Sequence, residues 1–524
     1  MTSSFQPRAG GRTTAGAMFL GLSCVLGLSA GCKRSPAPTP APPPVATTPA
    51  TEPTPEPTPE PAPEPTPLPS GIAPILQQYK GDLDGMVKRR LIRVLTVQSP
   101  IFYFVDRGRE VGLTYETIEA FEKSLNTRLG NKVITVHVIA IPVPRSELIP
   151  RLLAGEGDIA AAALTVTRDR KTRVDFSAPF ATGVKEVLVT GPSAPPVADL
   201  NDLSGKEVYV RASSAYAEHL GVLNARFKKE GRAPVKILKA DEVLEDGDIL
   251  EMVNAGLVPA TVVDSYMAEL YTQVFPNISV HADISSPPMQ IAWAFRKGSP
   301  KLKQSLDAFV KSSKQGTLSG NVLINRYLKT NKWVKNARSD EDRHRFESMV
   351  SLFQKYGKQY DLDYLLMVAQ GYQESGLDQT KKSGAGAIGV MQVLPSTARD
   401  KAVNIPNIDQ VEDNIHAGVK YIRWVIDNYY KDPGITPVNR ALFAFASYNA
   451  GPAKVNALRR EAKAQGLNPD RWFSNVELVA ARRIGRETVT YVANIYKYYL
   501  AYQLVEHRTE ERQQAKATVS KKAR

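Results

Sequence analysis

The residue of this sequence best suited to proton transfer is Glu374, which ends an apolar helical pattern. Apolar side chains recur at helical spacing from Tyr364 to Gln373, and Asp361 or Asp363 precedes them as a helix cap. Apolar neighbours would raise the pKa of this carboxyl toward neutrality, as an acid that donates a proton requires. Position alone favours a solvated surface glutamate, so the assignment depends on the segments that follow.

Two turns rich in glycine and polar residues follow Glu374. The first runs from Gly384 to Gln392, and the second is Ser447-Tyr-Asn-Ala-Gly451. Residues 384–389 fit the spacing G-x-G-x-x-G, but a helix precedes them, and no acid in a second strand lies about 20 residues further on. The dinucleotide interpretation is therefore rejected. The turns instead suit the wall and floor of a site that holds a polymer beside the acid.

The motifs around these turns resemble the lysozyme-like domain of the soluble-type lytic transglycosylases. The matching segments cover roughly 347–502 and keep the family's order: Glu374-Ser375, Ser383, Gly389-Val-Met-Gln392 with Pro395 and Ala398, Asn414 to Gly418 with Tyr421-Ile422, Ser447-Tyr-Asn-Ala-Gly-Pro452, and Glu487-Thr488 with Tyr491-Val492. The resemblance implies a mainly helical domain that cleaves peptidoglycan glycan strands without a cofactor or a metal.

A mechanism follows from the resemblance. Glu374 would protonate the glycosidic oxygen between N-acetylmuramic acid and N-acetylglucosamine. It would then take the proton of the muramyl 6-hydroxyl, which closes on C1 and leaves a 1,6-anhydro end. No water is consumed, so a second carboxylate that activates a water is not required.

The same resemblance implies a set of substrate-binding residues: Ser375, Ser383, Gly389, Met391, Gln392, Tyr448, Asn449, Glu477 and Tyr491. Ser383 and Gln392 would hydrogen-bond the N-acetyl group or the sugar, and Tyr448 would position the reacting ring. Asn449 would fix the corner, Tyr491 would line the groove, and Glu477 would contact a sugar or orient the site. Structural alternatives remain, with Ser383 as a turn serine, Tyr448 as a packed aromatic and residues 449–451 as a helix-ending turn.

The part of the chain from about 82 to 313 alternates strand and helix patterns, as expected of an α/β domain. Buried strands are expected at 93–97 and 159–164, and a further strand at 132–139. Helices are expected at 115–125 and 145–154.

This region resembles the solute-binding proteins of amino-acid transporters in Gly157-Asp158-Ile159, Thr165 to Arg170 and Val174 to Phe180. The resemblance implies two α/β lobes, with the second at about 192–285 and a return to the first near Ile291. Arg170 would grip the α-carboxylate of an amino acid or muropeptide ligand, and Asp264 its ammonium. The alternatives are a solvated charge for Arg170 and a helix cap for Asp264.

Charge and composition restrict the class of partner. The 524-residue chain has a formal charge of +14, which suits an anionic partner. No arginine-rich arm, zinc-finger spacing or aromatic RNA-binding signature accompanies this charge, so nucleic acid is not expected. The six histidines are scattered and the two cysteines are Cys24 and Cys32, so neither a metal site nor a disulfide is expected in the folded part.

The first residues are typical of a bacterial lipoprotein signal. Arg8 and Arg12 precede a short apolar run that ends Leu28-Ser-Ala-Gly-Cys32. Cys32 is expected to carry a lipid anchor, with an ordinary signal peptide as the alternative, and Lys33 after it indicates the periplasmic face of the outer membrane. The Pro-rich stretch that follows is expected to be an extended spacer.

The prediction is thus a multidomain protein, with a two-lobed α/β periplasmic solute-binding domain followed by a mainly α-helical lysozyme-like domain. The expected segments are a lipoprotein signal (1–32), a disordered Pro-rich linker (33–80), the solute-binding domain (81–320), a linker (321–346), the catalytic domain (347–505) and a basic tail (506–524), of which 513–524 is expected to be disordered. This order resembles the membrane-bound lytic transglycosylase F family. The first hypothesis is a lytic transglycosylase whose N-terminal domain regulates or targets it. The alternatives are a muramidase on the same fold and a non-catalytic cell-wall sensor, which the presence of Glu374 disfavours.

Overall fold

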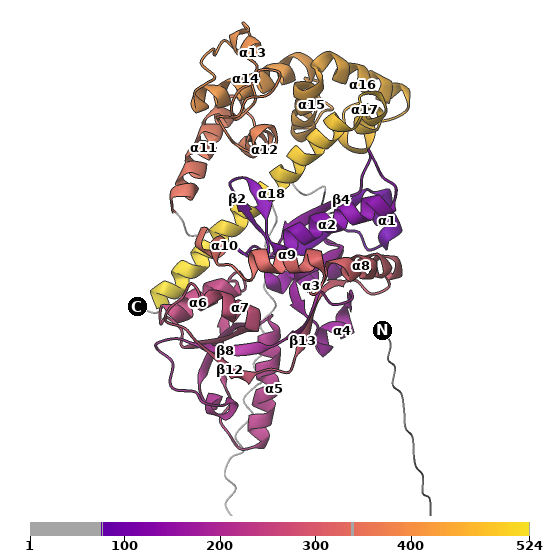
Figure 1. Ribbon diagram of the computed structural model, residues 1–524. Coiled ribbons are helices and arrows are strands. Elements are labelled where there is room, and N and C mark those ends of the chain that lie inside the picture. Colours follow the sequence, from indigo (N-terminus) through magenta and orange to yellow (C-terminus); the bar gives the residue numbers. More distant parts are fainter. Residues whose placement is uncertain (1–74, 76, 337–339, 523–524) are drawn as a thin grey trace, which may run out of the picture. The chain divides into compact units, whose positions relative to one another are not determined.

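The structure, a computed structural model, describes residues 75, 77–336 and 340–522 (Figure 1). The expected lipoprotein signal, Cys32 and nearly all of the Pro-rich spacer lie outside these residues. An α/β half is followed by a helical half, which confirms the predicted fold class. Within the part of the chain that the structure describes, no helix is long and apolar enough to cross a membrane.

The first lobe of the α/β half is one mixed sheet with the strand order β4-β1-β5-β13-β6, and β7 also pairs with β13. β1 lies parallel to β4 and β5, whereas β13 runs antiparallel to β5 with Ile291 opposite Thr165. Its elements are α1 (Leu83–Lys88), β1 (Leu91–Thr96), β2 (Phe104–Asp106), β3 (Arg109–Val111), α2 (Leu113–Arg128), β4 (His137–Pro142), η2 (Arg145–Glu147), α3 (Leu148–Ala154), β5 (Ile159–Thr165), α4 (Arg168–Arg173), β6 (Asp175–Phe176), β7 (Ala181–Val184) and β13 (Met289–Phe295).

One expected strand begins later than the sequence pattern indicated. The pattern predicted a strand from Lys132, but β4 begins at His137. The Asn126 side chain hydrogen-bonds both the backbone N–H and the carbonyl of Val136. Those bonds hold the segment before His137 against α2 instead of in the sheet.

The second lobe lies between two crossings of the chain, and the return to the first lobe near Ile291 is confirmed. It contains an antiparallel sheet of order β11-β8-β12 and a parallel pair, β9 and β10. Its elements are β8 (Glu186–Thr190), η3 (Leu200–Leu203), β9 (Glu207–Arg211), α5 (Ala215–Lys229), β10 (Lys236–Ala240), α6 (Asp246–Asn254), β11 (Ala260–Asp264), α7 (Ser265–Tyr271) and β12 (Ser279–Ser285).

The expected linker at 321–346 is largely helical where it is described. α8 (Pro300–Ser313) leads into α9 (Leu318–Tyr327), α10 (Lys332–Asn336) and α11 (Asp340–Gln359). Tyr327 is buried, stacks on Trp333 with 5.7 Å between ring centroids, and accepts a hydrogen bond from Gly112 N–H at 3.1 Å. The polar composition suggested a solvated joint, but these aromatic contacts attach it to the first lobe.

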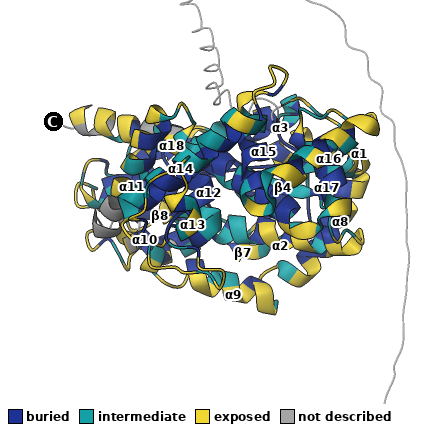
Figure 2. Ribbon diagram, turned by 90° about the horizontal axis from the view of Figure 1, so that it is seen from above, coloured by how far each residue is buried: buried dark blue, intermediate teal, exposed yellow. Residues whose placement is uncertain are grey.

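The helical half is organised around α15, whose residues 441–447 are all buried (Figure 2). Apolar residues surround this helix on every side, as is usual for the central helix of a bundle. The elements are α12 (Tyr364–Ser375), α13 (Pro395–Arg399), α14 (Val411–Tyr429), α15 (Pro437–Ala450), α16 (Pro452–Ala464), η4 (Trp472–Val476), α17 (Glu477–Arg483) and α18 (Arg486–Lys522).

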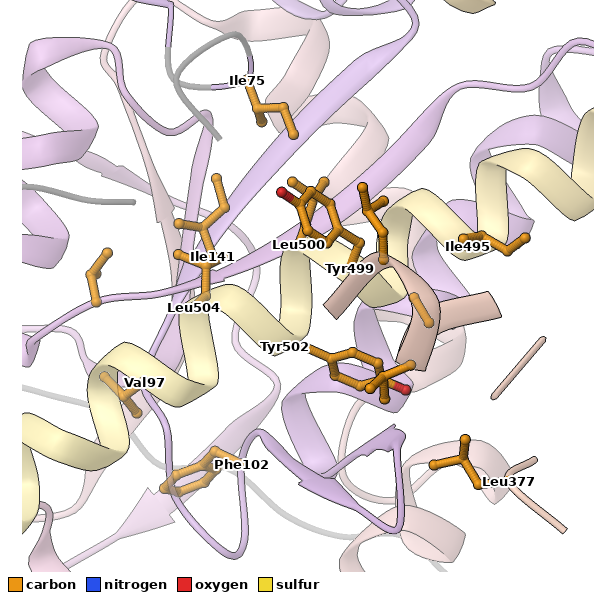
Figure 3. Packing of buried hydrophobic residues seen from close by; sticks show 14 of the residues in the cluster. Ile75, Val97, Phe102, Ile141, Leu377, Ile495, Tyr499, Leu500, Tyr502 and Leu504 are labelled. Atoms are coloured by element: carbon orange, nitrogen blue, oxygen red, sulfur yellow. The ribbon is translucent and has the colours of Figure 1, made fainter. Parts of the chain in front are cut away.

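The disorder expected at 513–524 is wrong for the residues that the structure describes, because α18 continues as a helix to Lys522. Figure 3 shows Tyr502 and Leu504 of this helix in one buried cluster with Val97 and Ile141 of the first lobe. Further along, Arg512 pairs with Asp248 of α6 at 2.7 Å. The basic composition suggested solvent exposure, whereas the acids of the second lobe neutralise this end of the helix.

Candidate active site and ligand cleft

α12 places Glu374 in the last turn of a well-capped helix. Asp363 accepts a hydrogen bond from Leu365 N–H at 2.9 Å, as predicted for one of the two candidate caps, and Gly376 ends the helix with φ +75°. Leu366, together with residues 367–371, is buried. The buried face fixes the helix, and the acid therefore has a defined position at its end.

The carboxyl group of Glu374 has an environment suited to proton transfer. Burial raises its pKa to about 7, against smaller opposing effects of a hydrogen bond from Tyr491 and the charge of Lys381. The Tyr491 hydroxyl donates to Glu374 Oε1, and Lys381 Nζ donates to the Glu374 backbone carbonyl at 3.3 Å. At neutral pH the carboxyl is therefore present in both protonation states.

The turn after α12 is held rigidly by buried hydrogen bonds. Ser375 Oγ donates to the carbonyl of Val390 at 2.9 Å, and Met391 N–H donates to Asn414 Oδ1 at 2.8 Å. Gly389 has φ +77°, and a Cβ atom there would lie 2.6 Å from side-chain atoms of Asn414 and Gln379, so only glycine fits. Ser375, Gly389 and Met391 therefore stabilise this turn from its buried side.

Two further expected residues of this turn bond to its own backbone. Gln392 Nε2 donates to the carbonyls of Lys381 at 3.1 Å and Gly389 at 2.9 Å, and the Gln392 backbone has φ +48°. Ser383 Oγ accepts from Ala387 N–H at 3.0 Å. The hydrogen bond from Ala387 N–H is the contact that the interpretation of Ser383 as a turn serine predicts.

α15 and α18 contribute the aromatic side of the site. The half-buried Tyr448 donates to the carbonyl of Met391 at 2.7 Å, and burial followed by the charge of Glu374 raises its pKa well above the usual value. Asn449 accepts from Thr488 Oγ1 at 2.6 Å, which ties the corner after α15 to the start of α18. Tyr448 and Tyr491 therefore both lie close to the acid.

Glu477 is placed differently from the other expected residues. Its carboxylate is fully buried and pairs with Arg90 of the first lobe at 2.7 and 2.9 Å, and it also accepts from Ser474 N–H at 3.0 Å. These bonds occupy both of its oxygens. In this arrangement Glu477 joins the two halves of the protein.

The two ligand residues expected in the α/β half lie in different lobes, Arg170 in α4 of the first and Asp264 at the end of β11 in the second. Burial, then the charge of Asp246, raises the pKa of Asp264 to about 7. Its Oδ2 accepts from Tyr266 at 2.8 Å, while its buried Oδ1 has no hydrogen-bond partner. Asp264 heads α7 but makes no capping bond with its side chain, so the helix-cap interpretation does not account for it.

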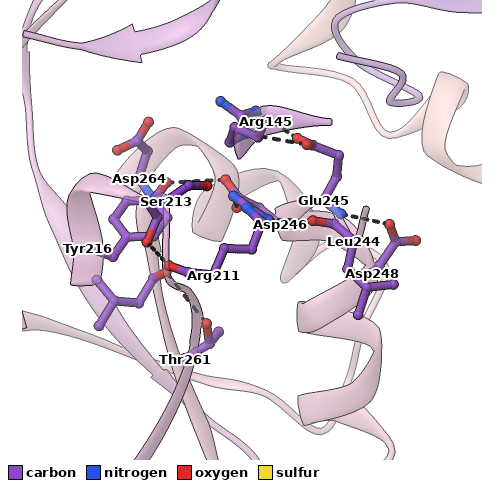
Figure 4. Close-up of polar contacts among 12 residues, drawn as sticks. Arg145, Arg211, Ser213, Tyr216, Leu244, Glu245, Asp246, Asp248, Thr261 and Asp264 are labelled. Atoms are coloured by element: carbon purple, nitrogen blue, oxygen red, sulfur yellow. Dashed lines mark hydrogen bonds and ion pairs between the residues drawn. The ribbon is translucent and has the colours of Figure 1, made fainter. Parts of the chain in front are cut away.

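Arg170 of the first lobe contacts the second lobe. Its guanidinium donates to the carbonyls of Thr165 and Ser213, both at 3.1 Å, and lies 3.3 Å from Glu218 of α5. Its side chain is buried, so the solvated-charge alternative is wrong. Figure 4 shows a second bridge nearby, between Arg145 of the first lobe and Glu245 of the second, at 2.6 Å.

Sequence reasoning missed several residues of these sites. Lys381 and Arg90 carry no motif of their own, and Arg90 reaches Glu477 over a separation of 387 residues. Gln370 lies one helical turn before Glu374 and is fully buried, although neither polar atom of its side chain has a hydrogen-bond partner. The signal that could have identified it is a polar residue on the buried face of an apolar helix.

Comparisons with known proteins agree with this division. Residues 92–329 match the bacterial extracellular solute-binding proteins of family 3, and residues 351–470 match the transglycosylase SLT domain. A solved structure of an ancestral arginine-binding protein bound to arginine is 25% identical over 46% of this chain and 98% of that chain, with a TM-score of 0.38.

Two relatives of similar architecture come from Pseudomonas fluorescens and Pseudomonas syringae pv. syringae. Each is named membrane-bound lytic murein transglycosylase F and is 30% identical over 78% of this chain, which corresponds to 84% and 82% of the relatives' own lengths. The chain therefore belongs to the membrane-bound lytic murein transglycosylase F family and is a peptidoglycan lytic transglycosylase.

Proposed function

We propose that Glu374 serves first as general acid and then as general base in this reaction. The observation that carries the proposal is a carboxyl whose pKa burial raises to about 7 and whose Oε1 is held by Tyr491. Such a group can both give and take a proton near neutral pH.

The proposed reaction cleaves the β-1,4 bond between N-acetylmuramic acid and N-acetylglucosamine. Glu374 gives its proton to the glycosidic oxygen as the bond from that oxygen to C1 breaks. The muramyl 6-hydroxyl then bonds to C1 and gives its proton back to Glu374, which leaves a 1,6-anhydro end. Tyr448 and Tyr491 flank the reacting ring, and Ser383, Gln392 and Asn449 contact the sugars.

Mass spectrometry of peptidoglycan digested by the purified protein and by Glu374→Gln tests the proposal. Anhydro-ended fragments from the first and none from the second are expected. Reducing ends from the native protein would make it a muramidase on the same fold. Bound glycan without products from either protein would make it a sensor.

We also propose that the solute-binding domain regulates or targets catalysis in response to an amino acid or muropeptide. Asp264 with its free Oδ1 would hold the ligand's ammonium, and Arg170 its carboxylate after release from Glu218. The support for coupling is contact: the hairpin of β2 and β3 accepts a hydrogen bond at Gly108 from Tyr502 of α18, the helix that also carries Tyr491.

This coupling is tested by adding peptidoglycan-derived peptides to the protein. Measured binding together with a change in the turnover rate is expected. Binding with unchanged turnover would leave targeting as the function of the domain.

The remaining proposals concern the first residues of the chain. Lipidation of Cys32 would attach the protein to the periplasmic face of the outer membrane, and the Pro-rich stretch would hold the body away from it. Metabolic labelling with a fatty acid, compared between the native protein and Cys32→Ala, tests the anchor.

A further inference from the structure

The site contains one buried polar side chain to which neither the reaction nor the fold assigns a use. Gln370 lies on α12 four residues before Glu374, so the two side chains share one face of the helix. Its exposure is 0%, and neither Oε1 nor Nε2 has a hydrogen-bond partner. A buried carboxamide without partners is destabilising, so its presence calls for a reason other than packing.

The hydroxyl of Tyr491 is a polar group on which the carboxamide of Gln370 acts. Burial raises the pKa of this hydroxyl well above its usual value, and the carboxamide of Gln370 acts in the opposite direction. The amide therefore lies close to the phenol hydroxyl, although neither of its polar atoms forms a hydrogen bond there. Tyr491 of α18 also donates to Glu374, so this tyrosine lies between two residues of α12, Gln370 and Glu374.

The same two helices contain a complete version of this arrangement. Gln503 Nε2 donates to the Tyr499 hydroxyl at 2.7 Å, and that hydroxyl donates to Asp363 Oδ2 at 2.8 Å. There too the glutamine acts to lower the pKa of the tyrosine. When an amide N–H donates to the oxygen of a tyrosine hydroxyl, the hydroxyl proton remains available to be donated to a carboxylate.

We propose that Gln370 is a positioning residue that keeps Tyr491 a hydrogen-bond donor to Glu374 Oε1. A tyrosine hydroxyl has one proton and can also accept, so its direction is decided by the other groups around the oxygen. In the proposed arrangement Gln370 Nε2 moves into hydrogen-bond distance and donates to that oxygen, so the Tyr491 proton points to Oε1. The proton of the neutral acid must then sit on Oε2, the oxygen left for the substrate. The inference rests on the proposed role of Glu374 as the acid.

The other charged or titratable groups near Glu374 do not perform this task. Lys381 acts on the backbone carbonyl of Glu374, and Tyr448 gives its proton to the carbonyl of Met391. Without Gln370, Tyr491 could accept a proton from Oε1 instead of donating. Part of the neutral acid would then hold its proton on the unproductive oxygen, and the ionised acid would lose part of its stabilisation.

The test replaces Gln370 with methionine, which keeps the length and the buried shape but removes both polar atoms. The matched control is Gln503→Met, the same change in the arrangement that ends on Asp363. Gln370→Met is expected to lower kcat roughly 10-fold on soluble glycan fragments with KM nearly unchanged. Activity requires the protonated acid, so it falls as pH rises through the pKa of Glu374. That falling limb is expected to move to higher pH in Gln370→Met and to stay in place in Gln503→Met.

A double-mutant cycle decides whether Gln370 acts through the tyrosine. In the Tyr491→Phe background, Gln370→Met is expected to cause no further loss of kcat. A loss of equal size in that background, or an unmoved pH limb, would overturn the proposal. The chemical ends of the products from the same reactions are analysed separately. Reducing ends would refute the anhydro reaction, whereas the double-mutant cycle would still test whether Gln370 acts on Glu374 through Tyr491.

Discussion

The raised pKa of Glu374 has a consequence for stability that can be measured apart from catalysis. In the folded protein the pKa is about 7, against an ordinary value of 4.5. The folded state therefore holds this proton more tightly than the unfolded state, and the carboxyl costs stability once it ionises. Because the folded pKa is the higher one, the cost is absent below about pH 4.5 and grows until about pH 7.

The difference of 7 − 4.5 = 2.5 pKa units corresponds to an upper limit of about 3.4 kcal/mol. The side chain is partly exposed, so solvent screening reduces the expected value to roughly 2 kcal/mol. Glu374→Gln keeps the shape and the hydrogen-bond acceptor for Tyr491 but cannot ionise. The variant is therefore expected to be more stable than the native protein by this amount at pH 8, and by almost nothing at pH 4.5.

Urea unfolding of both proteins at a series of pH values measures the effect. The difference between the two at one pH cancels the titration of all other groups. Glu487→Gln, which changes an exposed glutamate of the same half, is the matched control. A difference that stays constant from pH 4.5 to pH 8 would refute the argument that burial raises the pKa of Glu374.

Three further predictions concern the contacts between the domains and the ligand cleft. Arg90→Leu leaves the carboxylate of Glu477 buried without its partner, and a loss of roughly 3 kcal/mol in unfolding free energy is expected, whereas an unchanged urea midpoint would show that the pair is dispensable. Binding of an amine ligand should weaken as pH falls through about 7, because Asp264 becomes neutral, and calorimetry that shows equal affinity at pH 6 and pH 8 would remove Asp264 from the site. Asp248→Ala removes the partner of Arg512, so amide exchange at the end of α18 should become faster, while equal rates would mean that the ion pair does not hold the helix.

The two domains and the helix that ends at Glu374 could be predicted because they depend on local patterns and motifs. The apolar periodicity before Glu374 and the cap at Asp363 lie within one helix, and both agree with the structure. The return to the first lobe near Ile291 was predicted from the resemblance to the solute-binding proteins, and the pairing of Ile291 with Thr165 agrees with it. Such signals require no knowledge of which distant residues meet.

The remaining features depend on contacts between distant segments. The tail at 513–524 has a basic composition, and contacts with the acids of α6 in the second lobe help to explain why it is helical to Lys522. The pair of Arg90 and Glu477 likewise could not be predicted from the sequence pattern, since the two residues are 387 positions apart. Gln370 was not identified for a different reason: a single polar residue within an apolar helical pattern is too weak a signal to stand out in the sequence.

α18 offers a physical reason why the two halves should respond to each other. Near its start Tyr491 holds the acid, in its middle Tyr502 bonds to Gly108 of the first lobe, and near its end Arg512 bonds to Asp248 of the second lobe. A helix of this kind bends only gently, so it cannot absorb a large rotation between the lobes without losing contacts. A ligand that closes the lobes must therefore either release Arg512 from Asp248 or shift α18, and a shift of α18 would move the Tyr491 hydroxyl relative to Glu374. Regulation through the solute-binding domain would then act on the proton of the acid.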